Sequence, residues 1–240
     1  MTYIFTQSKG KFYFENPSDY FSEISALDFY HEVGYALNNV CRYAGHCTQF
    51  YSVLSHTLLG VKVLEQYQQV ILRIIQDKIP IPDIERHVVW RSLMTCWLLH
   101  DASEAYLGDV PSPLKGLLPD YREIEKSVQS GIEEKFYYHN SGDINVSGLD
   151  EIIRDIAKRV DTAMLCAEKK LLTKDMQEWL GLEDFLKDDF NRQLANEAYE
   201  VLDAFLKQSK TPSSDNRSPA SQYAHKLHTH NVSSFAKWVK

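Results

Sequence analysis

The sequence has no apolar run that approaches the roughly 20 residues needed to cross a bilayer, so no membrane-spanning segment is expected. Its N-terminus, MTYIFTQSKGKF, lacks the basic start and the apolar stretch of a secretory signal. The four cysteines form no Cys-x-x-Cys pair, which argues against a disulfide framework or a zinc finger. These absences predict a cytoplasmic protein with reduced thiols and no membrane partner.

Positive charge is also in short supply. The 240 residues contain 26 Lys and Arg against 33 Asp and Glu, which gives a net charge of −7 at pH 7. The broad basic surface that duplex nucleic acid requires is therefore not expected. A few local cations and a metal ion would still suffice for a small phosphate ester, so a small-molecule partner remains the better expectation.

Proline is absent between Pro119 and Pro212, which is consistent with long helices. Apolar residues recur at helical spacing in residues 51–66, 70–78, 88–107, 120–136, 149–172 and 186–207. Gly108 is expected to cap the third of these helices, and Asp120 with Glu123 resembles a capping box for the fourth. Two aromatic and β-branched runs in residues 3–14, around a turn at Gln7–Gly10, predict a small hairpin.

The fold class expected is therefore all-α, a helical bundle with a small N-terminal β-hairpin, over residues 1–207. Residues 208–240 have a different composition. Their first part, QSKTPSSDNRSPASQ, is rich in serine, proline and polar residues, and a short basic segment follows. This composition predicts a flexible linker and a C-terminal segment outside the catalytic domain.

Two adjacent residues of different ligand type, His100 and Asp101, lie near the end of the helix predicted for residues 88–107. Near a helix end both side chains can reach one ion, whereas in mid-helix they would point apart. Imidazole nitrogen and carboxylate oxygen together suit Mn, Co, Fe, Ni or Zn better than calcium or a pure magnesium site. Alone the pair is weak evidence, but with further ligands from other helices it would predict one divalent transition-metal ion, with Mg as the alternative.

Two more polar residues lie on apolar helix faces: His56 in residues 51–66, and Asp161 at the edge of the stripe in residues 149–172. A core histidine bonded to the backbone, and a pair of Asp161 with Arg159 or Lys158, are the alternatives. A carboxylate is costly to bury unless it is paired or metal-bound. The candidate metal ligands, from three helices, are His56, His100, Asp101 and Asp161.

Glu104 follows Asp101 by three residues and His100 by four, so it shares their helix face. A carboxylate beside a metal-bound water is placed for proton transfer, which makes Glu104 the candidate acid/base. A solvated glutamate at a helix end is the alternative. Asp109 could contact the same water or a substrate hydroxyl, or act only as a turn residue.

The string HDASEAYLGDVPSPLK, residues 100–115, resembles the motif block of the HD superfamily of metal-dependent phosphohydrolases, in particular bacterial and phage 5′-deoxynucleotidases and deoxynucleoside triphosphate triphosphohydrolases. CRYAGHCTQFYSVLSHTLL, residues 41–59, and KRVDTAML, residues 158–165, are similar to their segments for the first and last metal ligands. The resemblance covers roughly residues 10–207, and the ordered set His, His-Asp, Asp is more specific than His-Asp alone.

The resemblance implies substrate-binding roles for residues outside the metal set. Arg42 and Lys115 match cations that hold the substrate phosphate, although Arg42 could also be a surface residue before a helix. Tyr43 stands where related deoxynucleotidases often have Trp, which puts base or sugar selectivity in doubt but keeps an aromatic ring. His46 either touches phosphate or caps the following helix.

The resemblance also implies the reaction, which is hydrolysis of the 5′ phosphate ester of a (deoxy)nucleotide to nucleoside plus phosphate or triphosphate. Such nucleotidases are often dimers or higher assemblies, so a homo-oligomer is expected by analogy. The alternatives are a non-catalytic nucleotide-binding HD regulatory module and an alarmone-type pyrophosphohydrolase. Ala105 after Glu104 counts against the latter, which resembles His-Asp-x-x-Glu-Asp. A cyclic-dinucleotide phosphodiesterase would need an extension that is absent.

Overall fold

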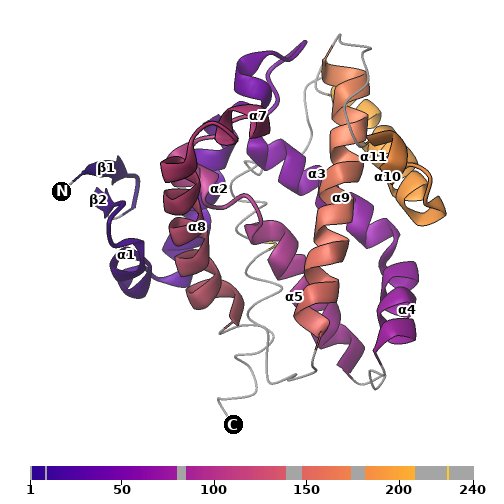
Figure 1. The fold of residues 1–240 in the computed structure, drawn as a ribbon, viewed down its shortest axis with the longest axis horizontal. Helices are drawn as coiled ribbons and strands as arrows, with labels where there is room; N and C mark the ends of the chain where they lie inside the picture. Colours follow the sequence, from indigo (N-terminus) through magenta and orange to yellow (C-terminus); the bar gives the residue numbers. More distant parts are fainter. Residues whose placement is uncertain are drawn as a thin grey trace.

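The computed structural model describes residues 2–8, 10–79, 85–138, 148–173 and 182–208, together with Lys226 (Figure 1). Its elements, in chain order, are β1 (Tyr3–Thr6), β2 (Gly10–Tyr13), α1 (Pro17–Glu23), α2 (Ala26–Asn39), η1 (Arg42–Gly45), α3 (Val53–Gln66), α4 (Gln68–Lys78), α5 (Arg86–Leu99), α6 (Glu104–Leu107), α7 (Ser112–Lys115), α8 (Pro119–Glu133), η3 (Glu134–Tyr138), α9 (Leu149–Leu172), α10 (Leu182–Phe185) and α11 (Asp189–Gln208). The all-α class is confirmed. Within the part described, no helix has the length and apolar character that crossing a membrane requires.

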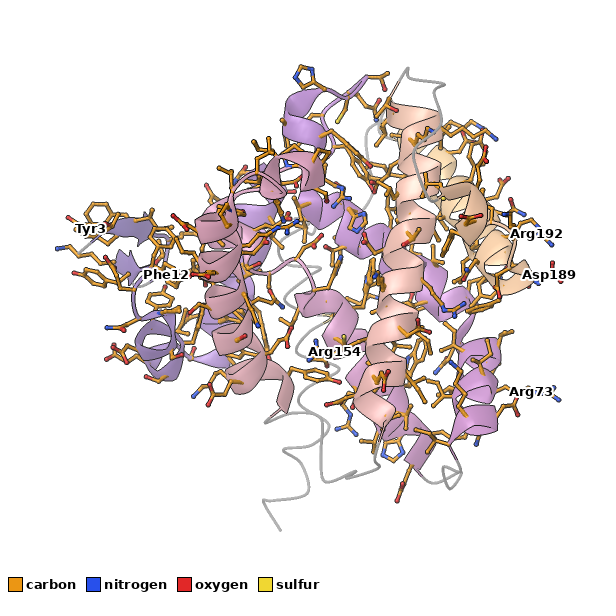
Figure 2. The ribbon with its side chains drawn as sticks, in the orientation of Figure 1. Tyr3, Phe12, Arg73, Arg154, Asp189 and Arg192 are labelled. Carbon is orange, nitrogen blue, oxygen red and sulfur yellow. The ribbon has the colours of Figure 1, made fainter. Side chains whose placement is uncertain are left out.

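The N-terminal hairpin is confirmed. Strands β1 and β2 pair antiparallel, with Thr6 opposite Gly10, and Gly10 has a φ of 93° that favours glycine at the end of the turn. Phe12 is fully buried and lies against Tyr106 at a ring-centroid distance of 4.4 Å. Figure 2 labels it where the hairpin meets the helices. Phe12 is the one fully buried side chain of a two-stranded sheet whose other residues are half-buried or exposed.

The helices form a bundle around α9, the long helix that runs top to bottom in Figure 1. Helix α9 contacts α11, α5 and α3, and α3 also contacts α2, α5 and α11. The buried residues of α9 recur every three or four positions, from Leu149 through Ile153, Ile156 and Val160 to Met164. The sequence predicted these boundaries and this face. The arrangement leaves α3, α5 and α9 in mutual contact, and these helices carry the candidate ligands.

The helix predicted for residues 88–107 is interrupted, which corrects that expectation. Helix α5 ends at Leu99, and residues 100–103 form tight turns in which Ala102 N–H donates to Leu99 O (3.1 Å) and Glu104 N–H to Asp101 O (3.0 Å). In a continuous helix, Trp97 O would accept from the N–H of residue 101. It accepts instead from His100, through the backbone N–H at 3.3 Å and through the ring Nδ1–H, so the histidine caps the end of the helix with both its backbone and its side chain.

Two other local predictions meet different outcomes. Gly108 ends α6 with a φ of 78°, as the cap prediction requires. The capping box at Asp120 and Glu123 is wrong, because α8 begins at Pro119 and shows no side-chain cap. Proline at the first helical position supplies the start instead, since its missing N–H would be unpaired there anyway. The predicted linker and basic segment, residues 208–240, lie outside the described residues except for Gln208 and Lys226.

Candidate metal centre

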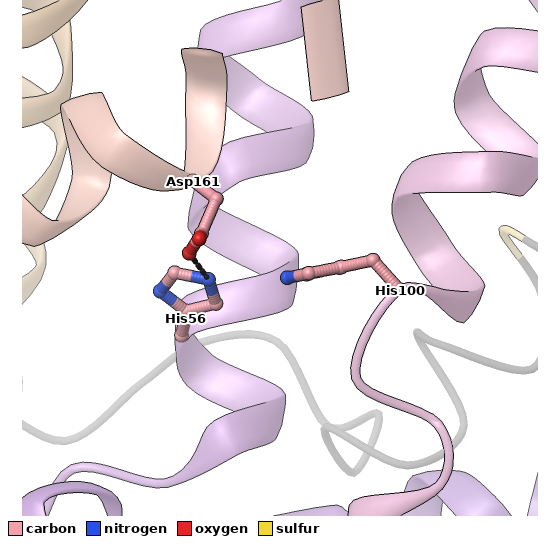
Figure 3. A group of neighbouring side chains, drawn as sticks. All are labelled: His56, His100 and Asp161. Atoms are coloured by element: carbon pink, nitrogen blue, oxygen red, sulfur yellow. Dashed lines mark ion pairs between the residues drawn. The ribbon is translucent and has the colours of Figure 1, made fainter. Parts of the chain in front are cut away.

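Three helices bring one nitrogen or oxygen donor each to a common point (Figure 3). His56 comes from α3, His100 ends α5, and Asp161 comes from α9. Their donor atoms all lie within 4.8 Å of one another, and His56 Nε2 is 3.3 Å from Asp161 Oδ1. His56 is fully buried, whereas 43% of the Asp161 side chain is exposed. The group can hold a metal ion with one open side.

Each imidazole of this group is oriented through its Nδ1 atom. His56 Nδ1 lies 2.6 Å from Glu168 Oε1, and His100 Nδ1 bonds to the backbone oxygen of Trp97. A carbonyl oxygen can only accept, so the Nδ1 of His100 carries the proton. Both Nε2 atoms are buried and have no hydrogen-bond partner in the described part of the chain. Each Nε2 lies near a carboxylate oxygen, that of His56 near Asp161 and that of His100 near Asp101. This arrangement fits metal ligation, in which outer partners fix the ring and leave the other nitrogen for the ion.

Packing between α3 and α5 holds His100 in this position. The Trp97 ring stacks on the His100 imidazole with centroids 4.2 Å apart, and Trp97 Nε1–H donates to Thr57 O at 2.8 Å. The indole fits because α3 has a glycine at residue 60. A Cβ atom there would lie 2.0 Å from the Trp97 ring. The glycine of α3 therefore determines how closely the two histidine-bearing helices approach.

Asp101 lies beside the three-residue group but is not one of its members. Its Oδ2 is 3.1 Å from His100 Nε2 and accepts from Arg42 Nη1–H at 3.4 Å. Burial acts to raise the pKa of Asp101, but His100, His56 and Arg42 outweigh it and hold the pKa well below its usual range. The side chain is thus an ionised carboxylate that contacts His100 but lies outside the group of three.

His56 is similarly affected by its neighbours. Burial and the charge of Arg42 lower the pKa of His56, but the carboxylates of Glu168 and Asp161 outweigh them and raise it to about 9. The raised pKa favours a ring that carries a proton on Nε2 as well as on Nδ1. A metal ion that takes Nε2 displaces that proton, so the affinity of this site should increase with pH.

Glu104 and Lys115 line a hollow of about 330 Å³ that also includes His100 and Asp101. Burial, with the charges of Asp101 and Asp109, raises the pKa of Glu104 to about 9. Its Oε2 is buried without a hydrogen-bond partner in the described structure, and its Oε1 lies 3.7 Å from Lys115 Nζ. The structure thus brings the predicted acid/base and one predicted phosphate cation to the same cavity.

Asp109 belongs to the same acidic group. It is partly buried just after Gly108, and burial raises the pKa of its carboxyl. Its charge acts on Glu104, and its carboxylate accepts a hydrogen bond from the backbone of Tyr43. Asp109 therefore lies next to both the proposed acid/base and the Arg42 loop.

The segment η1 carries two of the other three predicted substrate residues, Arg42 and Tyr43, and its backbone is strained. Tyr43, Ala44 and Gly45 have φ values of 57°, 49° and 82°. For a residue other than glycine, this left-handed conformation costs about 1–2 kcal/mol. Contacts on either side hold it, since Arg42 N–H donates to Tyr51 O and Thr48 N–H donates to Leu172 O at the end of α9. Such strain in a held loop is typical of functional sites.

His46 differs from the other predicted site residues. Its side chain is exposed, and its backbone N–H closes the η1 turn by donating to Tyr43 O at 2.9 Å. The prediction that it caps the following helix is wrong. Ser52 caps α3 with its side-chain oxygen, which accepts from Ser55 N–H at 3.0 Å.

The comparison with known proteins adds a family. Over 157 residues the chain is 31% identical to the uncharacterized protein YfdR of Escherichia coli (strain K12), which covers 65% of this chain and 68% of YfdR. The chain belongs to the YfdR family. No family model matches it. The name of YfdR states no activity, so the chemistry of this member of the YfdR family has to be argued from the site itself.

Glu168 is a residue of this site that the sequence patterns did not predict. It is fully buried on α9 and contacts His56, Arg42 and Tyr43. Its neighbours Lys169 and Lys170 make the stretch look like a solvated face. A signal was nevertheless present, because residue 168 follows Met164 by four positions and Asp161 by seven, which places it on the buried face of α9.

Proposed function

We propose that this member of the YfdR family is a divalent-metal phosphohydrolase of the HD superfamily that cleaves the 5′ phosphate ester of a nucleotide. The observation that carries the proposal is the pair of buried Nε2 atoms of His56 and His100. Neither has a hydrogen-bond partner in the described structure, and they converge with Asp161 at the edge of a hollow lined by Glu104 and Lys115.

The donor set favours a transition metal. His56, His100 and Asp161 would hold the ion, and Asp101 would be the fourth ligand. Two imidazole nitrogens with carboxylate oxygens suit Mn, Fe, Co, Ni or Zn, whereas magnesium and calcium prefer oxygen ligands alone. When bound, such an ion supplies Lewis-acid polarisation of a phosphoryl oxygen and a water of lowered pKa.

The acid/base step is assigned to Glu104. Its carboxyl is buried in the hollow, four residues beyond His100 across the tight turns of residues 100–103. Its raised pKa makes the ionised carboxylate a stronger proton acceptor. Glu104 takes a proton from the water that attacks phosphorus. The bond between phosphorus and the 5′ oxygen breaks, and that oxygen receives a proton. A monophosphate would yield nucleoside and phosphate, and a triphosphate would yield nucleoside and triphosphate.

Cations on two sides of the hollow suit a phosphate group. Lys115 lies inside it, paired at 2.5 Å with Glu125, and Arg122 and Lys126 of α8 also line it. Arg42 approaches from η1 through its contact with Asp101. A substrate phosphate would compete with these carboxylates for the cations. Charge-assisted bonds of this kind are made in the ground state, so they should contribute to binding as well as to turnover.

A release assay tests the proposal directly. The purified protein, loaded in turn with Mn, Co, Mg and Zn, is incubated with ribo- and deoxynucleotides, and nucleoside, phosphate and triphosphate are measured. We expect nucleoside release with at least one transition metal and loss of release in Asp101→Ala and His100→Ala, with loss of bound metal. Lys187→Ala, in an exposed pair with Asp184, is the control that should behave as wild type.

Other outcomes would favour the alternatives. Tight nucleotide binding without release of any product would indicate a regulatory module. Release of pyrophosphate from an alarmone would indicate a pyrophosphohydrolase. If Asp101→Ala retains stoichiometric metal by elemental analysis, Asp101 is not a ligand. Arg42→Ala and Lys115→Ala should raise KM, because both remove a charge that meets phosphate before the transition state.

A further inference from the structure

The two oxygens of the Glu168 carboxylate serve two different parts of the site. Oε1 lies 2.6 Å from Nδ1 of His56. Oε2 accepts from the hydroxyl of Tyr43 at 2.6 Å and lies 3.2 Å from Nε of Arg42. The side chain is fully buried. One carboxylate therefore contacts a candidate metal ligand on one side and the strained η1 loop on the other.

We propose that Glu168 is a positioning residue that couples the metal centre to the phosphate-binding loop. It orients His56 for the ion and at the same time holds the hydroxyl of Tyr43 and the guanidinium of Arg42, which also contacts Asp101. It touches neither metal nor substrate. The coupling rests on the proposed function only in so far as Arg42 is taken to meet the substrate phosphate.

A carboxylate is needed because all three partners are donors. The Nδ1–H of His56, the hydroxyl of Tyr43 and the guanidinium of Arg42 each require an acceptor, and an ionised carboxylate is an acceptor on both oxygens. An amide at residue 168 has one acceptor and one donor end. If its oxygen faces His56, its NH₂ group opposes Arg42. If it is reversed, NH₂ faces Nδ1, and a neutral ring then carries its proton on Nε2, where the ion should bind.

The contact of Glu168 with His56 predicts a defined loss of metal affinity when Glu168 is replaced. Partners that orient ligating histidines typically contribute about 10–100-fold to metal affinity. Glu168→Gln should therefore weaken binding of Co²⁺ within that range, as measured by titration calorimetry with the metal alone. Glu168→Asp keeps two acceptor oxygens on a shorter side chain, so it should recover part of the affinity that Glu168→Gln loses.

The contacts of Glu168 with the η1 loop can be tested without metal or substrate. Arg42 precedes a peptide bond that trypsin can cut, and only 12% of its side chain is exposed. Release of Tyr43 and Arg42 from Glu168 should speed cleavage after Arg42, followed by mass spectrometry. Glu168→Gln should be cut faster than wild type. Tyr43→Phe, which loses only the hydroxyl contact, should also be cut faster while its Co²⁺ affinity is unchanged.

Glu32→Gln is the matched control. Glu32 is a second buried glutamate that accepts from tyrosine hydroxyls, those of Tyr20 and Tyr106. None of its hydrogen bonds involves a candidate ligand or η1. Loss of a buried carboxylate in general would affect both variants, whereas the proposed role predicts wild-type Co²⁺ affinity and wild-type cleavage after Arg42 in Glu32→Gln.

A measurement on the wild-type chain keeps the proposal falsifiable if the residue 168 variants fail to fold. In the Zn²⁺-loaded protein, nitrogen-15 NMR of histidine should show His56 protonated at Nδ1, with a strongly downfield proton, and metallated at Nε2. Metallation at Nδ1 would overturn the proposal. So would wild-type Co²⁺ affinity or wild-type cleavage after Arg42 in Glu168→Gln. These readouts use no nucleotide, so an absence of hydrolysis would count against the proposed function and not against the role of Glu168.

Discussion

Two buried glutamates of this protein have similar first neighbours and different surroundings. Glu32, on α2, accepts from the hydroxyls of Tyr20 and Tyr106 and from the backbone N–H of Ser8 in the hairpin turn. All of these donors are neutral. Glu168, on α9, accepts from a tyrosine hydroxyl too, but its other partners are the guanidinium of Arg42 and the imidazole of His56.

The difference extends to the atoms around each carboxylate. At Glu32 the hydrogen bonds close on themselves and attach the hairpin to α2 and α6. Around Glu168 the contacts lead to His56, and through Arg42 and Asp101 to His100, and the Nε2 atoms of both histidines have no hydrogen-bond partner in the described structure. Buried polar atoms are normally paired, so an open network needs an explanation, and a ligand that completes it is the simplest one.

The largest expected effect is the loss of turnover when Glu104 in the hollow is replaced. Glu104→Gln should keep the metal and the nucleotide affinity but lose on the order of 10² to 10⁴ in turnover, the usual contribution of a general acid or base. Metal content, nucleotide affinity and kcat are measured on the same preparation. Loss of metal in this variant would make Glu104 a ligand. Near-normal turnover would make Asp109 the next candidate for the proton transfer.

The next effect concerns the packing that supports the open network. Gly60→Ala would place a methyl group against the Trp97 ring, which stacks on His100. Overpacking of a buried contact typically costs about 1–3 kcal/mol. We expect a loss of unfolding free energy in this range together with weaker Co²⁺ binding, both measured with purified protein. Unchanged metal affinity would mean that the packing of α3 against α5 does not determine the position of His100.

At the closed network the effects on stability and function should separate. Glu32→Gln places an amide NH₂ group near hydroxyl and backbone donors that require an acceptor. One unsatisfied buried group costs about 1–3 kcal/mol. Denaturant unfolding should show that loss, while Co²⁺ affinity and turnover stay at the wild-type level. A loss of turnover without loss of stability would contradict the distinction between the two glutamates.

Replacing Glu104 should raise the stability of the metal-free protein, whereas replacing Glu32 should lower it. Its pKa is raised from 4.5 to about 9 by burial and by Asp101 and Asp109, so between these values the folded state binds a proton that the unfolded state has lost. The stability contributed by this group therefore decreases as pH rises through that window. In chelator, Glu104→Gln should match wild type near pH 5 and exceed it by about 1–2 kcal/mol near pH 8. Equal stabilities at both pH values would contradict the burial argument.

The smallest effect is expected at the C-terminus. Every residue assigned to the site precedes residue 173, and the contact of Lys226 with Glu65 joins two partly exposed side chains on the surface. Exposed pairs contribute little. A chain that ends at Gln208 should therefore retain metal binding and turnover. If it folds but loses turnover, residues 209–240 contribute to the site or to an essential interface.

The sequence by itself determined most of the long helices, the hairpin and the ligand candidates His56, His100 and Asp161. Helical spacing of apolar residues is a local property, so α9 begins and ends at the predicted residues 149 and 172. The same spacing placed His56 on a buried face and Asp161 near one, where polar groups are costly without a partner. Glu104 was expected on the face of His100, and both residues line the same hollow.

The tertiary structure alone decided which polar atoms face one another. No local pattern predicted that His100 would end α5 by bonding to Trp97 O, that Gly60 would admit the Trp97 ring, or that Glu168 would join His56 to Arg42. These contacts depend on the crossing of α3, α5 and α9 and on the path of η1. Spacing along one helix specifies a face, but the partner of that face is specified only when the helices pack.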